Sequence, residues 1–387
     1  MRTSSCGWKT PKLRNPKRCR LMKPTRCHQL NAITFIGALP PPVTGMTAMS
    51  QVIVEALREG GPVRCFNWSR GKHLSGLRWK VARISGACIS FAKILFGRRQ
   101  RDAVVYYPLS SGWGLFYDFA ILGAARLRGY AVVVHHHVYS YIDRRDWRMA
   151  LLNRTLGRNC IHVVHCEQMK RDFLARYSTD AEFLFVPPTI VSEDVRALRR
   201  SPHGRFALGF MSNLTLAKGL DSAMATYTQL ASSGRDVALV LAGPCHGSKE
   251  RRMLDEIVRK WPHRVEYRGP VYDAAKSQFF ADIDVFLFPT RYNKESWGIV
   301  LTEALSANCP VIACRRGCVP WIVQDGCGIV VNDPNDFVPQ ACQAIIQWMD
   351  DEQEFERLRR RAGCRAQLLA DEAERQFAHF LKRIREL

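Results

Sequence analysis

ESWGIVLTEALSANCPVIA, residues 295–313, is the stretch that decides the fold of this chain. Glu303 shares one face of a predicted helix with small apolar residues, because a valine and two alanines recur around it at spacings of three and four. Gly298 and the polar residues before it predict a loop, and the apolar run PVIA predicts a short buried strand. A loop, a helix and a buried strand in this order are typical of α/β domains.

The same alternation of short apolar runs and longer amphipathic stretches extends over most of the chain. It predicts a first α/β domain over residues 31–187 and a second over 205–365, joined by a polar, proline-punctuated linker at 188–204. The charged segment 366–387 is predicted to be a helix that crosses back to the first domain. We expect two doubly wound, Rossmann-like domains whose ligand-binding loops face each other across a cleft.

The predicted strands differ in number between the two domains. Six apolar runs with strand character occur in the second domain. The first domain has four, at residues 32–39, 102–109, 130–137 and 160–165.

The composition indicates a globular protein with an anionic partner. The chain has 387 residues, 47% of them hydrophobic, and a formal net charge of +22. We see no run of about 18 uncharged apolar residues, so the sequence does not predict a transmembrane helix. Residues 1–30 contain nine lysines and arginines and no acid, which predicts a disordered basic tail. The fourteen cysteines are scattered and form no CxxC pair, which favours reduced thiols in the cytoplasm.

A second basic concentration lies within residues 72–101, which contain eight lysines and arginines and no acid. Apolar residues recur there at spacings of three and four, which predicts a basic amphipathic helix or helix pair. One interpretation is that the apolar stripe packs on its own sheet. The other, which we favour, is that the basic rim also contacts an anionic membrane. The predicted stripe consists of Leu74, Leu77, Val81, Ile84, Cys88, Phe91 and Leu95.

The residues of the 295–313 segment fit a nucleotide-sugar ligand. The carboxylate of Glu303, on an apolar helix face, requires hydrogen-bond partners, and ribose hydroxyls supply them. The helix start near Gly298 offers free backbone N–H groups and a positive dipole end to a diphosphate. Glu295, before the helix, is then placed to reach hydroxyls of a transferred sugar.

This segment resembles the donor-site signature of family 4 of the retaining glycosyltransferases, which have the GT-B fold and are also called the glycosyltransferase group 1 type. Residues 315–333, RRGCVPWIVQDGCGIVVND, resemble the glycine-valine-proline loop of that family. Residues 206–221, FALGFMSNLTLAKGLD, resemble its glycine-arginine-leucine…lysine-glycine element. In the family, this lysine and the arginine five positions earlier bind the donor pyrophosphate. Lys218 matches the lysine, whereas Asn213 stands at the arginine's position and removes one positive charge.

The resemblance implies further site residues. Within PPPVTGMT, residues 40–47, Gly45 corresponds to the glycine-rich first loop beneath the donor phosphates. His137 corresponds to a histidine that faces the donor sugar, and Val271 lies near the loop whose main chain contacts the nucleobase. The donor-binding set implied on the 295–313 segment is Glu295, Trp297, Gly298, Ile299, Val300 and Glu303, and the residues given catalytic roles are His137, Lys218 and Glu295.

Neighbouring histidines and cysteines raise the question of a metal site. Side chains alternate along a strand, so His136 is predicted to point away from His135 and His137. The same alternation separates His165 from Cys160, His162 and Cys166, which favours core packing for that group. The resemblance likewise implies no essential metal and no cofactor besides the substrate, a UDP- or GDP-linked sugar.

The function expected from these observations is transfer of a sugar to a hydroxyl acceptor with retention at the anomeric carbon. A saccharide or lipid-linked saccharide acceptor is expected, in cell-surface polysaccharide or lipid-linked oligosaccharide synthesis. We expect a cytoplasmic protein, peripheral on the inner face of the membrane. Two alternatives stay open: another GT-B enzyme acting on a sugar nucleotide, such as an epimerase or hydrolase, and a non-catalytic basic membrane- or nucleic-acid-binding protein. Nucleic acid is not expected as a partner, because the basic residues lack interleaved aromatics.

Overall fold

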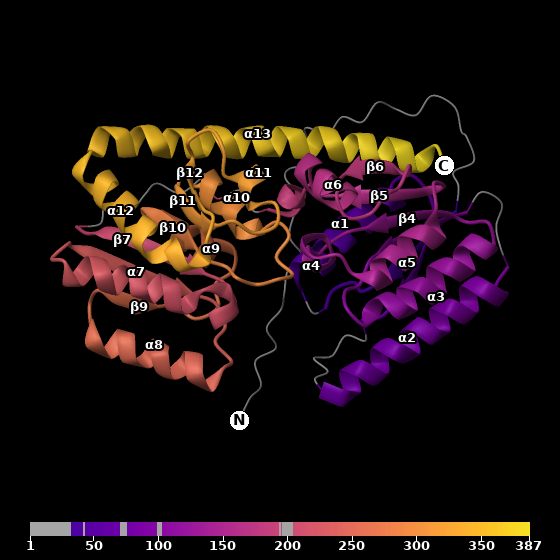
Figure 1. Cartoon of the computed structure of the whole chain (residues 1–387), viewed down its shortest axis with the longest axis horizontal. Helices are drawn as coiled ribbons and strands as arrows, with labels where there is room; N and C mark the ends of the chain where they lie inside the picture. The colour runs from indigo at the N-terminus through magenta and orange to yellow at the C-terminus, as the bar shows by residue number, and fades with distance from the viewer. Residues whose placement is uncertain (1–31, 42, 70–75, 99–102, 193–194, 196–203) are drawn as a thin grey trace.

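The computed structural model describes residues 32–41, 43–69, 76–98, 103–192, 195 and 204–387 (Figure 1). The predicted basic tail and most of the predicted linker lie outside the described residues. The chain forms two α/β domains, each built on a six-stranded parallel sheet, and the expected two-domain GT-B fold is confirmed.

The first sheet has the strand order β2-β1-β3-β4-β5-β6. Its chain order changes direction at β1, which lies between β2 and β3. Such a switch point places ligand loops at the carboxyl ends of the strands. The strands are β1 Ile33–Gly37, β2 Val63–Asn67, β3 Val104–Pro108, β4 Ala131–His135, β5 Cys160–Val164 and β6 Glu182–Phe185. The helices are α1 Gly45–Arg58, α2 Gly76–Phe96, α3 Gly114–Leu127, α4 Ser140–Asp143, α5 Trp147–Leu156 and α6 Glu167–Leu174.

The second sheet has the order β12-β11-β10-β7-β8-β9, and all six of its strands were predicted. Its strands are β7 Phe206–Met211, β8 Val237–Ala242, β9 Val265–Tyr267, β10 Val285–Phe288, β11 Val311–Cys314 and β12 Gly328–Val331. The helical elements are η2 Leu216–Lys218, α7 Leu220–Ser232, α8 Ser248–Lys260, α9 Asp273–Ala281, α10 Ile299–Ser306, α11 Val319–Ile322, η3 Pro334–Asp336, α12 Phe337–Asp350 and α13 Glu352–Arg385.

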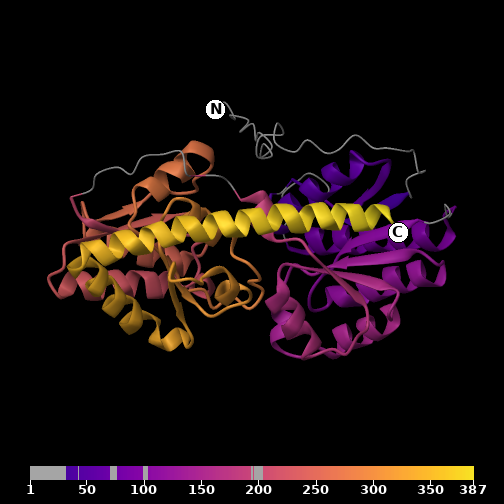
Figure 2. The same cartoon turned by 90° about the horizontal axis from the view of Figure 1, so that it is seen from above.

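The helix α13 runs along both domains (Figures 1 and 2). Phe355, near its start, packs in the core of the second domain. Phe380 and Ile384, near its end, are fully buried in the core between α1 and the first sheet. Arg383 adds a two-pronged ion pair to Glu182 at the start of β6, with 2.9 Å between Nε and Oε1. One continuous helix thus crosses back to the first domain, and residue 366 lies inside it.

Among the described side chains, the apolar stripe predicted for residues 72–101 is confirmed at Phe91 and Leu95, which are half-buried against the core, and is wrong at two other positions. Ile84 is 54% exposed, and Cys88 is exposed as well. The buried positions of α2 are instead Ala87, Ser90 and Ile94. Small residues let α2 lie close to its neighbours, and Trp68 Nε1 donates to Ser90 Oγ at 2.9 Å. None of the helices in the described part of the chain combines the length and apolar character needed to span a bilayer.

Candidate active site

Two helix starts meet where the domains face each other. In the first domain, Thr44 caps α1 by accepting a hydrogen bond from the backbone N–H of Thr47. In the second, α10 begins after Gly298, whose φ of 75° is a conformation that favours glycine. A Cβ atom added to Gly45 would lie 3.3 Å from Cδ1 of Ile299. The two glycine-containing loops implied by the resemblance are therefore in contact across the domain boundary.

Lys218 and Glu295, which lie 77 positions apart, form an ion pair. The ammonium group donates to a carboxylate oxygen of Glu295 and lies 4.7 Å from the ring centre of Tyr292. Lys218 ends η2, and the next residue, Gly219, has a φ of 86°. A Cβ atom on Gly219 would lie 2.2 Å from the backbone oxygen of Pro289, so only glycine fits there. The lysine-glycine element therefore packs directly on the loop that leads to Glu295.

The carboxylate of Glu303 is paired with a lysine that the sequence analysis missed. Nζ of Lys276 donates to Oε1 of Glu303 at 3.0 Å. The two side chains are 14% and 5% exposed. Lys276 comes from α9, which follows the loop containing Val271, so this pair joins α9 to α10. In the sequence, only the position of Lys276 shortly after that loop could have indicated that it belongs to the site.

His137 lies against the loop that contains Glu295. Ser296 Oγ donates to the backbone oxygen of His137 at 2.8 Å. The His137 side chain is buried, and within the described part of the chain its Nε2 has no hydrogen-bond partner. Burial lowers the pKa of His137 well below its ordinary value of 6.5, and the nearby His165 adds to this effect. A neutral imidazole with an unused ring nitrogen is therefore held at the seam between the domains.

The neighbouring histidines point in the directions that strand alternation predicts. The rings of His135 and His137 lie 3.9 Å apart, on the same side. His136 faces the other way and stacks on His162, with 2.9 Å between Nε2 and Nδ1. Within the described ranges, no group of histidine, cysteine and acidic side chains has a metal-binding arrangement. Burial lowers the pKa of His162 to about 3 and that of His165 to about 4, so both are neutral core residues.

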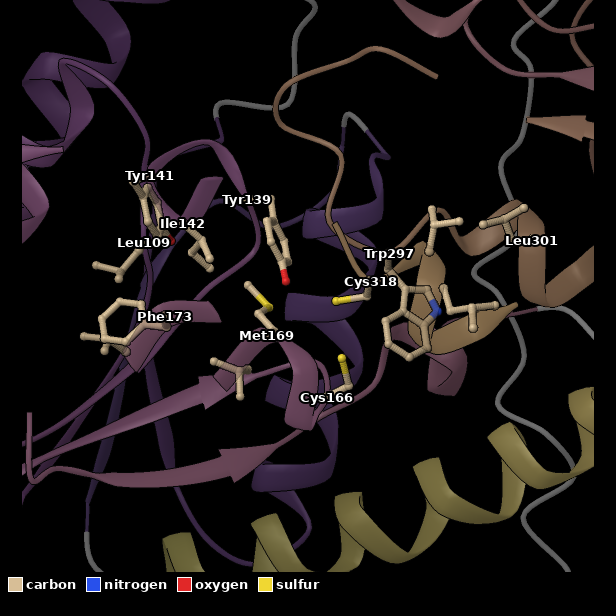
Figure 3. Packing of buried hydrophobic residues seen from close by; sticks show 14 of the residues in the cluster. Leu109, Tyr139, Tyr141, Ile142, Cys166, Met169, Phe173, Trp297, Leu301 and Cys318 are labelled. Atoms are coloured by element: carbon tan, nitrogen blue, oxygen red, sulfur yellow. The ribbon is translucent and has the colours of Figure 1, made fainter. Parts of the chain in front are cut away.

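The remaining residues implied by the resemblance take different positions. Trp297 is buried in the apolar core between the domains, beside Cys318 and Leu301, and its ring lies 6.1 Å from that of His165 (Figure 3). Ile299 and Val300 are half-buried at the start of α10, and Val271 is half-buried against the same core. Asn213 is exposed in the loop after β7.

Additional polar contacts link the two domains. Arg316, in the loop after β11, forms an ion pair with Asp143 of α4 at 2.5 Å. Nε of Arg316 also donates to the backbone oxygen of Tyr292 at 3.2 Å. Nearby, Gln168 Nε2 donates to the backbone oxygen of Gly317 at 3.2 Å. Burial raises the pKa of Asp143 above its ordinary value, although Arg316 opposes that shift. The sequence analysis missed Arg316, whose only signal was its place in the RRG turn of the matched loop.

A cavity of about 660 Å³ lies away from these residues, at the edge of the second sheet where its strands begin. Arg205, Asp236 and Arg264 line it, and these residues directly precede β7, β8 and β9. They also pair with one another, since Asp236 accepts ion pairs from both arginines. Ligands of parallel sheets bind at the carboxyl ends of the strands, so this cavity is not the candidate site.

Comparison with known proteins identifies the class of the second domain. Residues 205–351 match the model of the family described as "Glycosyl transferases group 1". This part of the chain is similar to the group 1 glycosyltransferases. This match covers η2, the loop before α10 and the loop after β11, which hold Lys218, Glu295 and Arg316.

Relatives of this glycosyltransferase extend the comparison to both domains. It is 24% identical over 296 residues to a D-inositol 3-phosphate glycosyltransferase of Corynebacterium diphtheriae, covering 70% of this chain and 68% of the relative. Sucrose-phosphate synthase of Thermosynechococcus elongatus has a similar structure, with a TM-score of 0.68 and 15% identity over 92% of this chain and 99% of that one. HepE of Anabaena, solved with UDP and glucose, gives a TM-score of 0.63 at 14% identity over 92% and 100%. At these identities the structural likeness shows the GT-B fold.

Proposed function

We propose that this glycosyltransferase moves a sugar from a nucleotide diphosphate sugar to a hydroxyl acceptor with retention of the anomeric configuration. The contact between Ser296 and the backbone of His137 carries the proposal, because it joins the segment that holds this buried histidine to the loop that holds Glu295. A histidine, a glutamate and a lysine from three elements are thus gathered at one seam. UDP and glucose in the HepE structure support a UDP-linked donor, with GDP as the alternative base.

The donor would lie along α10. Glu303, which is paired with Lys276, would accept hydrogen bonds from ribose hydroxyls. The start of α10 would receive the diphosphate, with Lys218 as the neighbouring cation. Glu295 would accept hydrogen bonds from the transferred sugar. Val271 would lie beside the base, with contacts from its main chain.

Transfer requires stabilisation of the charge that develops on the leaving diphosphate. The bond between the anomeric carbon and the diphosphate oxygen breaks while the acceptor oxygen forms a bond on the same face of the sugar. The acceptor's proton passes to the departing phosphate oxygen. Lys218 and the starts of α1 and α10 would supply the positive potential, which is why we propose that no metal is essential. The neutral His137 would hydrogen-bond a hydroxyl of the donor sugar.

The acceptor is proposed to be a saccharide or a lipid-linked saccharide, in surface polysaccharide or lipid-linked oligosaccharide synthesis. The formal charge of +22 supports work next to an anionic surface. The protein would then act in the cytoplasm, peripheral on the inner face of the membrane.

A panel of UDP-, GDP- and ADP-sugars tests the donor by thermal shift, because a ligand that binds only the folded state raises its Tm. Glu303→Ala should weaken donor binding by about tenfold or more, through loss of hydrogen bonds to a charged group. Glu256→Ala, on the exposed face of α8, is the matched control and should bind as the parent does. Unchanged donor binding in Glu303→Ala contradicts the site.

The reaction itself is tested by NMR of the product anomer formed with the best donor. Retention supports the proposal, and an inverted product contradicts it. Release of sugar from the donor at full rate without any acceptor would favour a hydrolase instead. Interconversion of donor sugars would favour an epimerase.

A further inference from the structure

The helices α2, α3 and α5 cover the face of the first sheet that lies away from α13 (Figure 1). Exposed apolar side chains are concentrated on these helices and at their ends. Among the described residues, thirteen large hydrophobic side chains are exposed, and eight belong to this layer. The eight are Ile84, Ile89, Phe96, Trp113, Phe116, Leu127, Trp147 and Leu151. We call this surface the aromatic face.

Three aromatic rings on the aromatic face contact one another in the open. Trp113 is 79% exposed and Trp147 is 65% exposed. Phe116 lies between them, with its ring centre 5.6 Å from that of Trp113 and 5.8 Å from that of Trp147. The guanidinium of Arg148 lies 5.7 Å from the Trp113 ring centre. Large aromatic side chains bury more apolar area than most residues when they find a partner, so their exposure marks a contact surface.

The charge of the same layer is mostly positive. Within the bounds of α2, α3 and α5 the sequence has seven lysines and arginines and a single acid, Asp118. Asp118 is fully buried, where it accepts hydrogen bonds from the Tyr107 hydroxyl and the Ser110 N–H at 2.7 Å each. At the end of this layer Asp146, which caps α5, is half-buried, and Arg148 binds both of its carboxylate oxygens, so that this pair adds no net charge. On α5 the exposed side combines Trp147 and Leu151 with Arg154 one turn further on.

We infer that the aromatic face docks on an anionic lipid bilayer. Indole rings and arginines together suit the headgroup region, where the ring contacts acyl chains and the guanidinium contacts phosphates. A second copy of this chain fits less well, because a symmetric contact would place cationic helices against the same cationic helices. The inference rests on the proposed function, because membrane docking would bring a lipid-linked acceptor to the domain that holds His137.

Vesicle co-sedimentation of the full chain tests the inference. Phosphatidylcholine vesicles that contain phosphatidylglycerol should bind the protein, and vesicles of phosphatidylcholine alone should bind it far more weakly. Trp113→Ala, Phe116→Ala and Trp147→Ala combined should lower the partition coefficient on the anionic vesicles about tenfold or more, from the apolar burial lost. The control, Leu368→Ala, removes an exposed apolar side chain from α13 and should bind as the parent does. Equal binding by the triple variant and the parent overturns the inference.

Tryptophan fluorescence locates the contact independently. Brominated lipids should quench part of the emission of the nine tryptophans, and the combined Trp113→Phe and Trp147→Phe variant should lose that quenching while still binding vesicles. Quenching that stays the same in this variant contradicts the inference. If the parent forms a dimer and the triple alanine variant is a monomer, the aromatic face contacts a second copy of the chain. That result also contradicts the inference.

Donor binding separates this inference from the proposed function. The triple variant changes only exposed residues and should keep the parent's Tm and its thermal shift with the sugar nucleotide. Donor binding without vesicle binding overturns the docking surface alone. Vesicle binding without donor binding in the parent overturns the proposed function alone.

Discussion

Arg316 of the second domain and Asp143 of the first form an ion pair across the domain boundary, with 2.5 Å between Nη2 and Oδ2. The pair lies in the same seam as the hydrogen bond from Ser296 to His137. Neither side chain is fully exposed, at 23% and 28%, so solvent screens the pair only in part. The domains are therefore held together by charge directly beside the candidate active site.

Replacing Arg316 with Ala should favour separation of the two domains. We expect a loss of about 1 kcal/mol in the free energy of unfolding and a larger radius of gyration by X-ray scattering. The exchanged pair, Asp143→Arg with Arg316→Asp, should recover part of the compactness that each single change loses. A radius of gyration that is unchanged in Arg316→Ala would show that the pair does not hold the domains.

Lys276→Met should destabilise the second domain by about 3 kcal/mol, because it leaves the buried Glu303 carboxylate without its cation. Adding Glu303→Gln to that variant should restore most of the loss, since no unpaired charge is then buried. Donor binding should stay weak in the double variant. Urea unfolding and donor thermal shifts measure the two quantities separately. Additive destabilisation in the double variant would mean that the two side chains do not interact.

Gly219→Ala should be more harmful than Gly234→Ala. The two glycines have nearly the same φ, 86° and 85°, so both substitutions carry the left-handed penalty of about 1–2 kcal/mol. A Cβ atom at Gly234 meets nothing within 4 Å, whereas one at Gly219 would lie 2.2 Å from the Pro289 oxygen. Urea unfolding should therefore show a larger loss in the free energy of unfolding for Gly219→Ala than for Gly234→Ala, and the difference measures the cost of that clash. Equal losses would refute the close packing of the lysine-glycine turn.

Acid should unfold the first domain through its buried histidines. Burial lowers the pKa values of His135, His136, His137, His162 and His165 below 6.5 in the folded chain. Their stabilising contribution is therefore present above pH 6.5 and is lost as the pH falls below it. For each of these histidines, the free energy of unfolding falls by up to about 1.4 kcal/mol per pH unit. Asp118 acts in the opposite sense, because burial raises its pKa to about 6, but it is a single group.

Urea unfolding at pH 7.5, 6.5 and 5.5 checks this expectation. The free energy of unfolding should fall by several kcal/mol between the last two points. His162→Phe should make the pH dependence shallower by about one proton. Constant stability over this range would contradict neutral, buried histidines.

The sequence predicted those parts of the fold that depend on local patterns. The strands of the second domain are mostly buried apolar runs, and all six were recognised. In the first domain β2 and β6 were missed, because both are edge strands with polar residues and half-buried positions. On α2 the spacing of large apolar residues predicted the buried face only in part, since Ile84 and Cys88 are exposed and the small residue Ala87 is buried instead.

The candidate site was only partly predictable for a related reason. The positions of Lys218 and Glu295 follow from the resemblance, and the structure shows the two side chains paired. The pairing of Lys276 with Glu303 depends on how α9 lies against α10 in the folded domain, and no periodicity within either segment predicts that contact. Arg316 contacts Asp143 across 173 positions of chain, so only the assembled domains bring them together.

The course of α13 also sets the order in which the chain completes its folding. Phe380, Leu381 and Ile384 fill the same core as Ile33 and Phe35 of β1. During synthesis, the first strand would leave the ribosome about 340 residues before the side chains that close its core. Until residues 380–384 are made, the first domain would expose an apolar groove along one side of its sheet. Chaperone binding to nascent chains should therefore persist until the last turns of α13 emerge.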